Sequence, residues 1–318
     1  MTTDMVGKAR RMPTARETSV MLISLGVWLG VTALCIGFRP EHIVLAVLLA
    51  ALFIATPLTR RTVVALIPFA LFGISYDWMN ILPNYEVNPV DIQGLYEAEK
   101  GWFGITVGEA MRLTPNEFFA LHHAPWADIL AGFFYLCWVP VPIIFGLYLF
   151  FSGNEKGYLH FALVFLLVNL LGFAGYYIHP AAPPWYVASH GFDFMPGTPG
   201  EVAGLGRFDQ LTGLGIFHGL YARNANVFAA VPSLHSAYML VAFIYSVRLH
   251  CPLWIKIACG VICAGIWWTA VYSSHHYIID VLCGIGVTLL GYVVFEYVLM
   301  RIPAFSRFIS RYAAYIKP

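Results

Sequence analysis

The stretch VYSSHHYIID, residues 271–280, places two adjacent histidines between two long apolar segments, residues 252–272 and 277–299, and an aspartate at the start of the second. If a helix begins near His276, then His276 and Asp280 lie one turn apart on one face, so the carboxylate can accept a hydrogen bond from one ring nitrogen and leave the other free. This spacing predicts an imidazole that is oriented to act as a nucleophile or a base. A His–Asp pair with a purely structural role is the alternative interpretation.

The residues around this pair do not indicate a metal site. His275 is five residues from Asp280 and is expected to point elsewhere, as a bystander or a minor contact. One histidine and one aspartate supply too few ligands for a metal, and no Cys, Glu or further His lies at a matching spacing. We therefore expect no metal and no cofactor. The six cysteines lie in or beside apolar segments and are expected to be small packing residues.

The composition predicts an integral membrane protein. Of 318 residues, 59% are hydrophobic, 16% are aromatic and only 11% are charged, which is far from the average of soluble domains. A helix that crosses a hydrocarbon core of about 30 Å needs roughly 20 apolar residues. We therefore expect an all-α protein with about eight transmembrane helices, at residues 18–38, 42–58, 62–82, 127–150, 158–178, 233–249, 252–272 and 277–299. The first segment is interpreted as a membrane anchor, because it is too long for a signal peptide and GFRPEH offers no cleavage site.

The distribution of lysine and arginine predicts the orientation in the membrane, because cytoplasmic flanks retain positive charge. Of the 18 such residues, 13 lie on the side of the two termini and the other 5 lie on the opposite side. We expect cytoplasmic termini and two extracytoplasmic loops, residues 83–126 and 179–232. The run GWFGITVGEAMRLTPNEFFALHH, residues 101–123, suits an amphipathic helix in the membrane interface. A net charge of +1 indicates no nucleic-acid partner.

Two further polar clusters lie at the same membrane face as the histidine stretch. They are HPAAPPWY, residues 179–186, and VPSLHSAY, residues 231–238. PSLHS is typical of a helix start, with Pro232 and Ser233 in the first turn, where unpaired backbone N–H groups and the helix dipole favour an anion such as phosphate. His235 lies in that turn and could give a proton to a leaving alkoxide. An N-capped helix with a histidine in its first turn is the alternative.

Together these motifs resemble the type 2 phosphatidic acid phosphatase superfamily, whose signature is P-S-x-H followed downstream by H-x-x-x-D. Within it, the chain is similar to the fungal-type inositol phosphorylceramide synthases. The likeness runs through HPAAPPWY, GTPGEVAGLGRFDQL, VFAAVPSLHSAY and WWTAVYSSHHYIIDVLCG. It implies a six-helix catalytic core at residues 62–299. Residues 1–61 would add a cytoplasmic N-terminus and two more helices, and residues 300–318 would form a basic cytoplasmic tail.

The resemblance also implies a chemistry, which is metal-independent phosphodiester transfer through a covalent phosphohistidine. His276 would attack the phosphorus, and Asp280 would orient and stabilise it. His235 would protonate the departing diacylglycerol oxygen and later take the proton of the acceptor hydroxyl. The implied donor is phosphatidylinositol and the implied acceptor is ceramide. The fungal-type synthases are longer and work with a second subunit, so the compact length favours a bacterial or otherwise minimal version.

The chain departs from the wider superfamily where that pattern carries charge. A Lys and Arg-Pro element, a Gly before the first histidine and an Arg ahead of the second are replaced here by APPWY, Leu234 and TAVYSSHH. The phosphate therefore lacks two arginines, and we expect Arg207 to clamp it instead. Arg223 is the only other basic residue in that loop. The alternative for Arg207 is an ion pair with Asp209 that stabilises the loop.

Four further residues are expected to contact the substrate or to support the site. Ser233 would supply a hydroxyl or backbone donor to the phosphate. Trp185 and Tyr186 follow a rigid Pro-Pro pair and would line the headgroup pocket. His179 is expected to support the site from further away. The pair at residues 122–123 receives no role.

Three other functions use the same features differently. A lipid phosphate phosphatase would use the same three residues with water as the acceptor. A related transferase would move phosphocholine or phosphoethanolamine. A transporter would carry broken helices and polar residues at mid-membrane depth, whereas the predicted segments here are almost free of charge.

Overall fold

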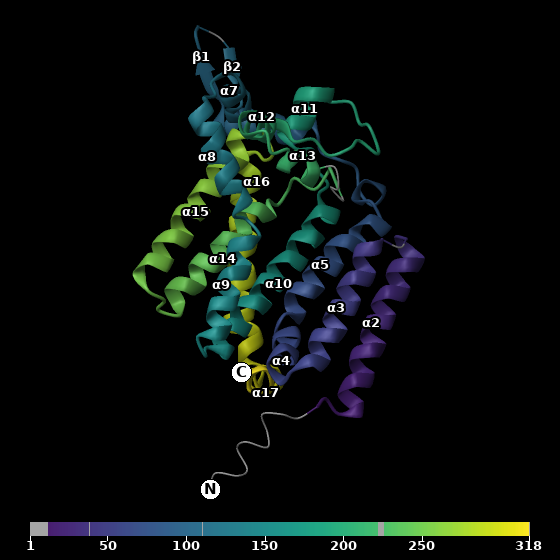
Figure 1. Cartoon of the computed structure of the whole chain (residues 1–318). Helices are drawn as coiled ribbons and strands as arrows, with labels where there is room; N and C mark the ends of the chain where they lie inside the picture. Colours follow the sequence, from purple (N-terminus) through teal and green to yellow (C-terminus); the bar gives the residue numbers. More distant parts are fainter. Residues whose placement is uncertain (1–11, 38, 110, 222–225, 318) are drawn as a thin grey trace.

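The chain folds into a bundle of long helices that is covered at one end by short helices and loops (Figure 1). The computed structural model describes residues 12–37, 39–109, 111–221 and 226–317. The bundle consists of α2 (Ala15–Cys35), α3 (Pro40–Ala55), α4 (Pro57–Ala65), α5 (Ile67–Trp78), α8 (Pro125–Leu136), α9 (Pro140–Phe151), α10 (Glu155–Ile178), α14 (Leu234–Arg248), α15 (Leu253–Tyr272) and α16 (Ile278–Val293). We call the covering layer the cap.

The cap is built from the two long loops of the sequence. Its elements are η2 (Met79–Ile81), η3 (Asn84–Glu86), α6 (Gln93–Phe103), β1 (Ile105–Val107), β2 (Met111–Leu113), α7 (Pro115–Leu121), α11 (Pro184–His190), η4 (Ala203–Leu205), α12 (Gly206–Thr212) and α13 (Ile216–Tyr221). At the other end, α16 continues through a π-helical turn, η5 (Val294–Val298), and a 3-10 turn, η6 (Leu299–Arg301), into α17 (Pro303–Ile316). The start of α2 and the end of α17 lie at this end (Figure 1).

Several helices are long and apolar enough to cross a membrane. Among the described residues, 4 helices meet this condition, or up to 6 if each of two bent pairs counts as one span. The bends are 47° between α4 and α5 and 43° between α8 and α9. Prolines explain both bends, because Pro68 and Pro140 cannot donate the helical hydrogen bond. This confirms a helical, multi-pass membrane protein.

Each of the eight predicted segments coincides with one helix or one bent pair, but their number as membrane crossings stays a prediction. Helix α3 is apolar and has 16 residues, and α14 has only 15. At 1.5 Å per residue, both are shorter than a hydrocarbon core of about 30 Å.

The amphipathic run at residues 101–123 does not form the expected interfacial helix. Strands β1 and β2 pair antiparallel within it, with Ile105 opposite Leu113. Gly108 has φ +66°, a conformation that favours a turn over a helix. The β-branched residues of Ile105–Val107 favour a strand for the same segment. The prediction of a single helix was therefore wrong.

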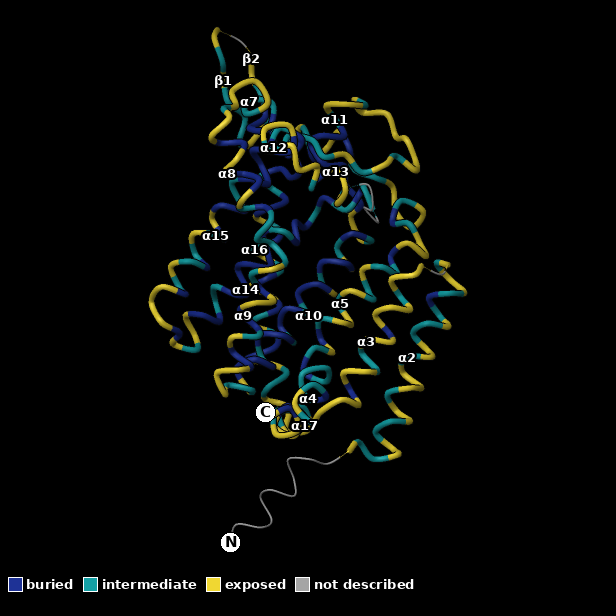
Figure 2. The backbone as a smooth tube through the Cα atoms, viewed as in Figure 1, coloured by how far each residue is buried: buried dark blue, intermediate teal, exposed yellow. Residues whose placement is uncertain are grey.

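The core of the protein lies around α10 and α14, whereas the first two helices are peripheral. Buried residues gather on α9, α10 and α14 in Figure 2, and α2 and α3 are largely exposed along their length. Only Thr32 is buried on α2. Exposed apolar faces of this kind suit a lipid environment.

The C-terminal segment, predicted as a basic tail, is a packed helix over most of its length. Ile309 and Ile316 of α17 are fully buried. The hydroxyl of Tyr312 donates a hydrogen bond to the carbonyl of Val64, at 2.6 Å. The helix thus covers the end of the bundle opposite the cap.

A charged cluster near that end joins three helical elements. Glu296 of η5 is buried and accepts hydrogen bonds from His160 Nδ1 at 2.8 Å and Tyr245 Oη at 2.6 Å. Its second oxygen accepts from Arg248 Nη2 at 2.8 Å. The buried charge is therefore paired, as burial requires, and the helical segments are less free of charge than the sequence suggested.

Three cap segments that are distant in sequence lie side by side. Ala181 forms parallel bridges with Asp91 on one side and Ala229 on the other. The amide of Ala181 donates to the carbonyl of Phe228 at 3.0 Å, and the amide of Asp91 donates to the carbonyl of Pro180 at 2.8 Å. These bonds place HPAAPPWY directly beside the segment that leads into α14.

Candidate active site

The two histidine motifs meet where α14 and α16 begin. Ser233 is the N-cap of α14, and its hydroxyl oxygen accepts from the amide of Ser236 at 3.4 Å. His235 lies in the first turn, as predicted. Pro232 precedes the cap instead of lying inside the first turn. The amide of Ser233 donates to the carbonyl of Asp280 at 2.9 Å, so this backbone donor is already used.

A glycine allows the two helix starts to come this close. A Cβ atom at Gly284 of α16 would lie 2.2 Å from the carbonyl oxygen of Ser233 and 2.4 Å from Oγ of Ser236. Both distances are below van der Waals contact, so a larger residue would push α14 away. Gly284 therefore sets the separation at which the histidines face each other.

His235, His276 and Asp280 form a hydrogen-bonded row. His235 Nδ1 lies 3.0 Å from His276 Nε2. His276 Nδ1 lies 3.3 Å from Oδ2 of Asp280, which also accepts from the amide of Tyr277 at 2.9 Å. Asp280 is fully buried and His276 is 5% exposed. The predicted i, i+4 relation thus leaves Nε2 of His276 directed at the second histidine.

The far side of His235 contacts a tyrosine and a tryptophan. Tyr135 Oη lies 3.0 Å from His235 Nε2, and it also makes a short hydrogen bond with the hydroxyl of Tyr221. The ring of Trp138 meets the His235 ring edge-on, with centroids 4.6 Å apart. His235 therefore has partners on both ring nitrogens.

His275 does not join the row. Its Nε2 lies 3.1 Å from the carbonyl of Val202, and its ring stacks on Tyr221 at 4.5 Å. This agrees with the expectation that His275 points away from Asp280.

The segment between α15 and α16, residues 273–277, is called the histidine turn. Loop 83–126 holds this turn in place, a role that the sequence did not reveal. Glu99 of α6 is fully buried, and its two oxygens accept from the amides of Ile278 and Ile279 at 2.9 and 3.1 Å. The side-chain amide of Asn116 donates to the carbonyls of Val271 and His276 at 2.8 and 2.9 Å. A carboxylate at the first turn of α16 also complements the helix dipole.

Burial sets the protonation of the groups in this turn. Burial lowers the pKa of His276 to about 4, and it also holds the pKa of His275 well below the usual histidine range. Burial raises the pKa of Glu99, against the effect of its two backbone hydrogen bonds. His276 is therefore neutral at pH 7, the form in which Nε2 carries a lone pair.

Arg207 lies close to the histidine turn. Its carboxylate partner is Asp128 and not Asp209, which was the alternative considered from the sequence. Its Nε donates to Oδ1 of Asp128 at 2.6 Å, and its guanidinium lies over the ring of Tyr272, 5.2 Å from the centroid. Asp209 instead accepts from His218, at 2.9 Å from Nδ1. The alternative of an Arg207–Asp209 pair was therefore wrong.

The free end of Arg207 points toward the turn. A Cβ atom at Gly204 would lie 3.0 Å from both terminal nitrogens of Arg207. The amide of Gly204 donates to the carbonyl of Ser273 at 3.0 Å, three residues before His276. Among the described residues, Nη2 of Arg207 is buried without a hydrogen-bond partner. Arg223, the other basic residue of this loop, lies outside the described residues.

Trp185 and Tyr186 lie inside the cap and do not join the histidine row. Both are buried, in a cluster with Ile92 and Phe228. The hydroxyl of Tyr186 donates to the carbonyl of Asp193 at 2.7 Å, which commits it to the cap itself. The amide of Trp185 donates to the carbonyl of Ser274 at 3.0 Å, so its backbone supports the turn. Substrate contact by these two side chains stays a prediction.

The other histidines of the cap have separate partners. His179 is paired with Asp91, with Nε2 and Oδ2 3.3 Å apart, and it is not hydrogen-bonded to the histidine row within the part of the chain that the structure describes. His123 lies 3.5 Å from Oδ2 of Asp128. His122 stacks on Phe118 at 4.3 Å. Among the described residues, no three His, Cys, Asp or Glu side chains are grouped so that they could hold a metal ion.

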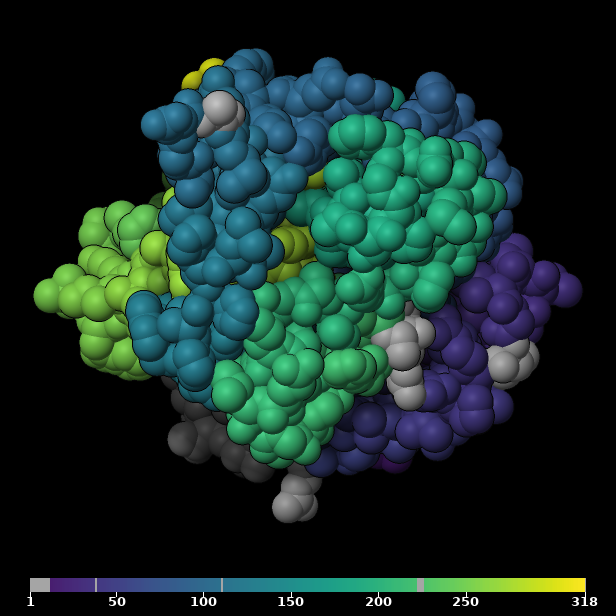
Figure 3. All heavy atoms as spheres, turned by 90° about the horizontal axis from the view of Figure 1, so that it is seen from above, coloured from purple at the N-terminus to yellow at the C-terminus, as the bar shows by residue number. Residues whose placement is uncertain are grey.

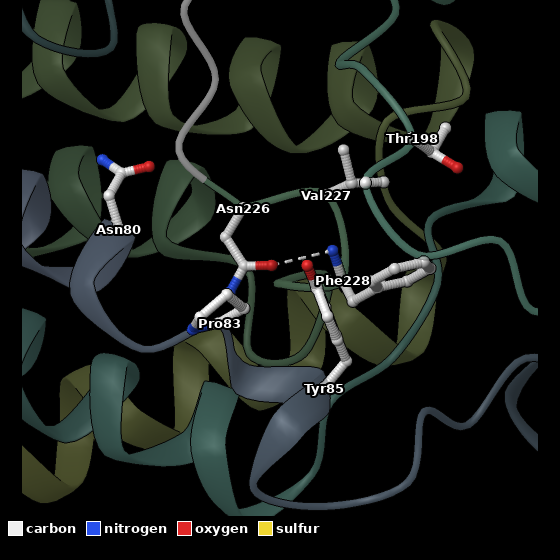
Figure 4. A pocket seen from close by; sticks show the side chains of 8 residues that line it. Asn80, Pro83, Tyr85, Thr198, Asn226, Val227 and Phe228 are labelled. Carbon is white, nitrogen blue, oxygen red and sulfur yellow. Dashed lines mark hydrogen bonds between the residues drawn. The ribbon is translucent and has the colours of Figure 1, made fainter.

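Two hollows open at the cap. Seen from the loop end, yellow-green atoms of the C-terminal third are visible in a hollow between the blue and green cap segments (Figure 3). A separate cavity of about 210 Å³ is shown in Figure 4, lined by Asn80, Pro83, Tyr85, Gly197, Thr198, Asn226, Val227 and Phe228. None of the residues in the histidine row lines that cavity.

The site and the fold define a class of membrane phosphotransfer enzyme, and comparison with known families agrees. The model of the PAP2 superfamily matches residues 106–294, more than half of the 318 residues, and the chain belongs to this superfamily. The resemblance seen in the two histidine motifs is thereby confirmed.

Three known synthases are similar to this chain in sequence. The chain is 58% identical to a phosphoinositol dihydroceramide synthase of Bacteroides thetaiotaomicron over 306 residues, which are 96% of this chain and 100% of that protein. It is 28% identical to the inositol phosphorylceramide synthase catalytic subunit AUR1 of Saccharomyces cerevisiae, over 78% of this chain and 59% of that protein. It is 31% identical to the inositol phosphorylceramide synthase of Candida albicans, over 51% and 35%. The chain thus spans less than two thirds of these fungal relatives. No solved structure matches it significantly.

Four residues at the site had no signal in the sequence. Tyr135 lies in an apolar run with other aromatics, where a tyrosine is ordinary. Glu99, Asn116 and Asp128 are ordinary polar residues in or just after loop 83–126, where polar residues are common. Only the folded chain brings them to the histidine turn.

Proposed function

We propose that this protein transfers phosphoinositol from phosphatidylinositol to a ceramide-type acceptor and releases diacylglycerol. The observation that carries the proposal is the 3.0 Å approach of His235 Nδ1 to His276 Nε2, with Asp280 on the other nitrogen of His276. Two imidazoles at this distance can act on one phosphoryl group. The synthase relatives support the choice of lipid substrates.

The first step forms a covalent intermediate. The lone pair on Nε2 of His276 attacks phosphorus, an N–P bond forms, and the P–O bond to diacylglycerol breaks. His235 Nδ1 gives its proton to the leaving oxygen. Asp280 accepts a hydrogen bond from Nδ1–H of His276, which keeps its proton, and the carboxylate stabilises the positive charge that develops on the ring.

The second step reverses these roles. His235 Nδ1 takes the proton of the acceptor hydroxyl, the new O–P bond forms, and the N–P bond breaks. The free Nη2 of Arg207 and the hydroxyl of Ser233 are suited to bind phosphate oxygens near the turn. Asp128 and Tyr272 hold the guanidinium for this purpose. No metal ion takes part, so activity should persist in EDTA.

The sidedness follows from the charge distribution. With 13 of 18 lysines and arginines on the side of the termini, the termini lie in the cytoplasm and the cap lies outside it. The catalytic core is the segment 62–299, with α2 and α3 as additional helices. A phosphodiester donor needs no ATP, which suits an extracytoplasmic site.

The test is a reaction of the purified protein with phosphatidylinositol and labelled ceramide. We expect a new inositol-containing sphingolipid and an equal amount of diacylglycerol. Free inositol phosphate without a labelled sphingolipid would indicate a phosphatase and contradict the proposal. Product only from phosphatidylcholine or phosphatidylethanolamine would show a different headgroup.

A further inference from the structure

The histidine row continues beyond His235 into two buried tyrosines. Tyr135 of α8 is 1% exposed, and its hydroxyl lies 3.0 Å from Nε2 of His235. The same hydroxyl is hydrogen-bonded to Tyr221, the last residue of α13. The full row is therefore Asp280, His276, His235, Tyr135 and Tyr221, and the proposed mechanism uses only the first three.

The two histidines have orienting groups of different charge. His276 Nδ1 faces the carboxylate of Asp280, whereas His235 Nε2 faces the neutral phenol of Tyr135. A carboxylate favours the charged ring and suits a nucleophile that becomes positive. A neutral phenol orients the ring without adding a negative charge that would hold an extra proton on it.

We propose that Tyr135, backed by Tyr221, is a positioning residue that keeps the Nε2 proton on His235 so that only Nδ1 exchanges protons with the substrates. This inference rests on the proposed function. As an acid, His235 carries protons on both nitrogens, and as a base it keeps only the one on Nε2. In both states Nε2–H donates to Tyr135, and the hydroxyl of Tyr135 donates to Tyr221. The tyrosines themselves exchange no proton with the substrates.

Packing keeps the ring and the phenol in this relation. The rings of Tyr135 and His235 lie with centroids 5.0 Å apart, and Trp138 closes the edge of the His235 ring. Tyr221 is held by stacking on His275 at 4.5 Å. This gives His275 an indirect part in the site, since it fixes the outer end of the row.

The experiment compares two donors that differ in their need for an acid. One donor is phosphatidylinositol, from which diacylglycerol leaves as an alkoxide that must be protonated. The other is an inositol phosphodiester in which p-nitrophenolate replaces diacylglycerol, because this group leaves without a proton. The measurement is the first-turnover release of the leaving group without ceramide, so that the second step does not contribute.

For Tyr135→Phe we expect the first-turnover rate with phosphatidylinositol to fall by about 10- to 100-fold, the loss typical when a partner that orients a histidine is removed. With the p-nitrophenyl donor the loss should be under about 3-fold, because the step needs no general acid. Tyr221→Phe should show the same pattern with a smaller loss. The phosphatidylinositol concentration that gives half of the maximal first-turnover rate should change little.

A matched control variant distinguishes this positioning role from a general loss of stability. Tyr158 is also 1% exposed, and its hydroxyl donates to the carbonyl of Ala65 at 2.7 Å, away from the site. Tyr158→Phe should lose a similar amount of thermal stability and keep its activity with both donors. If Tyr135→Phe does not fold, the losses of Tyr221→Phe with the two donors decide whether the positioning role holds.

Two results would overturn different claims. Equal losses with both donors in Tyr135→Phe and Tyr221→Phe, or no loss, would overturn the positioning role and leave the proposed function intact. Turnover by His276→Ala with either donor would instead refute the phosphohistidine mechanism. These outcomes do not overlap.

Discussion

Asp280 has two tasks that depend on the same oxygen. Its Oδ2 faces His276 Nδ1 and caps the backbone at Tyr277. An amide at this position can cap the helix through its remaining oxygen, but it can also turn its NH₂ group toward the ring and favour the wrong tautomer.

Asp280→Asn should therefore lower kcat by about 10²- to 10⁴-fold, since loss of a carboxylate that fixes a catalytic histidine has effects of this order. The measurement is the rate of sphingolipid formation by the purified variant. Asp77→Asn is the control, because Asp77 pairs with Arg39 and not with the histidine row. Near-normal turnover in Asp280→Asn would show that the tautomer of His276 is set by something else.

Arg207 offers a second test on a single side chain. Arg207→Lys keeps the charge but loses the planar fork that binds Asp128 and that we propose binds a phosphate oxygen at the same time. We expect kcat/KM to fall by about 10- to 100-fold, which corresponds to about 1.4 to 2.8 kcal/mol. Arg112→Lys is the matched control, since Arg112 lies in the cap and its side chain donates to the carbonyl of Gly101, away from the histidine row. A normal kcat/KM in Arg207→Lys would remove Arg207 from the phosphate site.

The arrangement of His276 and Asp280 was predicted correctly because it is local, since an i, i+4 spacing depends on a few neighbouring positions. Ser233 was expected in the first turn of α14 and is instead the N-cap that precedes it. The partner of Arg207 could not be predicted, because Asp128 is 79 residues away whereas Asp209 is nearby in the sequence. Sequence proximity favoured the wrong carboxylate.

At the scale of helices, the site depends on how closely α14 and α16 approach each other. Gly284→Ala would place a methyl group 2.2 Å from the carbonyl of Ser233. We expect a stability loss of about 1 to 3 kcal/mol, typical of overpacking, and a larger fractional loss of activity because His235 moves with α14. Thermal unfolding and turnover, measured together, check this.

Gly286 provides the control on the same helix. A Cβ at Gly286 has no atom within 4 Å, so Gly286→Ala should keep both stability and activity. Equal behaviour of the two variants would mean that close approach at Gly284 does not position the histidines.

Helix α6 supports the start of α16 through the carboxylate of Glu99. Glu99→Gln keeps one acceptor but turns an NH₂ group toward an amide of Ile278 or Ile279. Loss of one buried hydrogen bond costs about 1 to 3 kcal/mol, so we expect a lower unfolding temperature together with reduced kcat. Glu97→Gln on the same helix should change neither, since Glu97 bonds only Gln93. An active, stable Glu99→Gln would show that α16 holds its position without this cap.

Helix positions were predicted better than the cap. Apolar length alone located the bundle helices to within a few residues, because burial in lipid or core requires it. The segment 101–123 has the same apolar content as an interfacial helix, but Gly104 and Gly108 interrupt it and pairing of β1 with β2 satisfies its backbone instead.

At the scale of the whole molecule, the charge distribution predicts which end faces the cytoplasm. In a background without the native cysteines, Leu214→Cys in the cap and Ser310→Cys in α17 are both exposed. In intact spheroplasts, an impermeant maleimide should label position 214 and spare position 310 until the membrane is opened. The reverse pattern would place the active site in the cytoplasm and contradict the proposed sidedness.

The support of α16 by Glu99 has a consequence for biosynthesis. The carboxylate and the helix start that it holds are 179 residues apart in the chain. During translation α6 leaves the ribosome long before Ile278 exists, so the two can meet only when nearly the whole protein has been made. A nascent chain that stops before His276 therefore carries His235 without the proposed nucleophile, and we expect it to be inactive on the lipids around it.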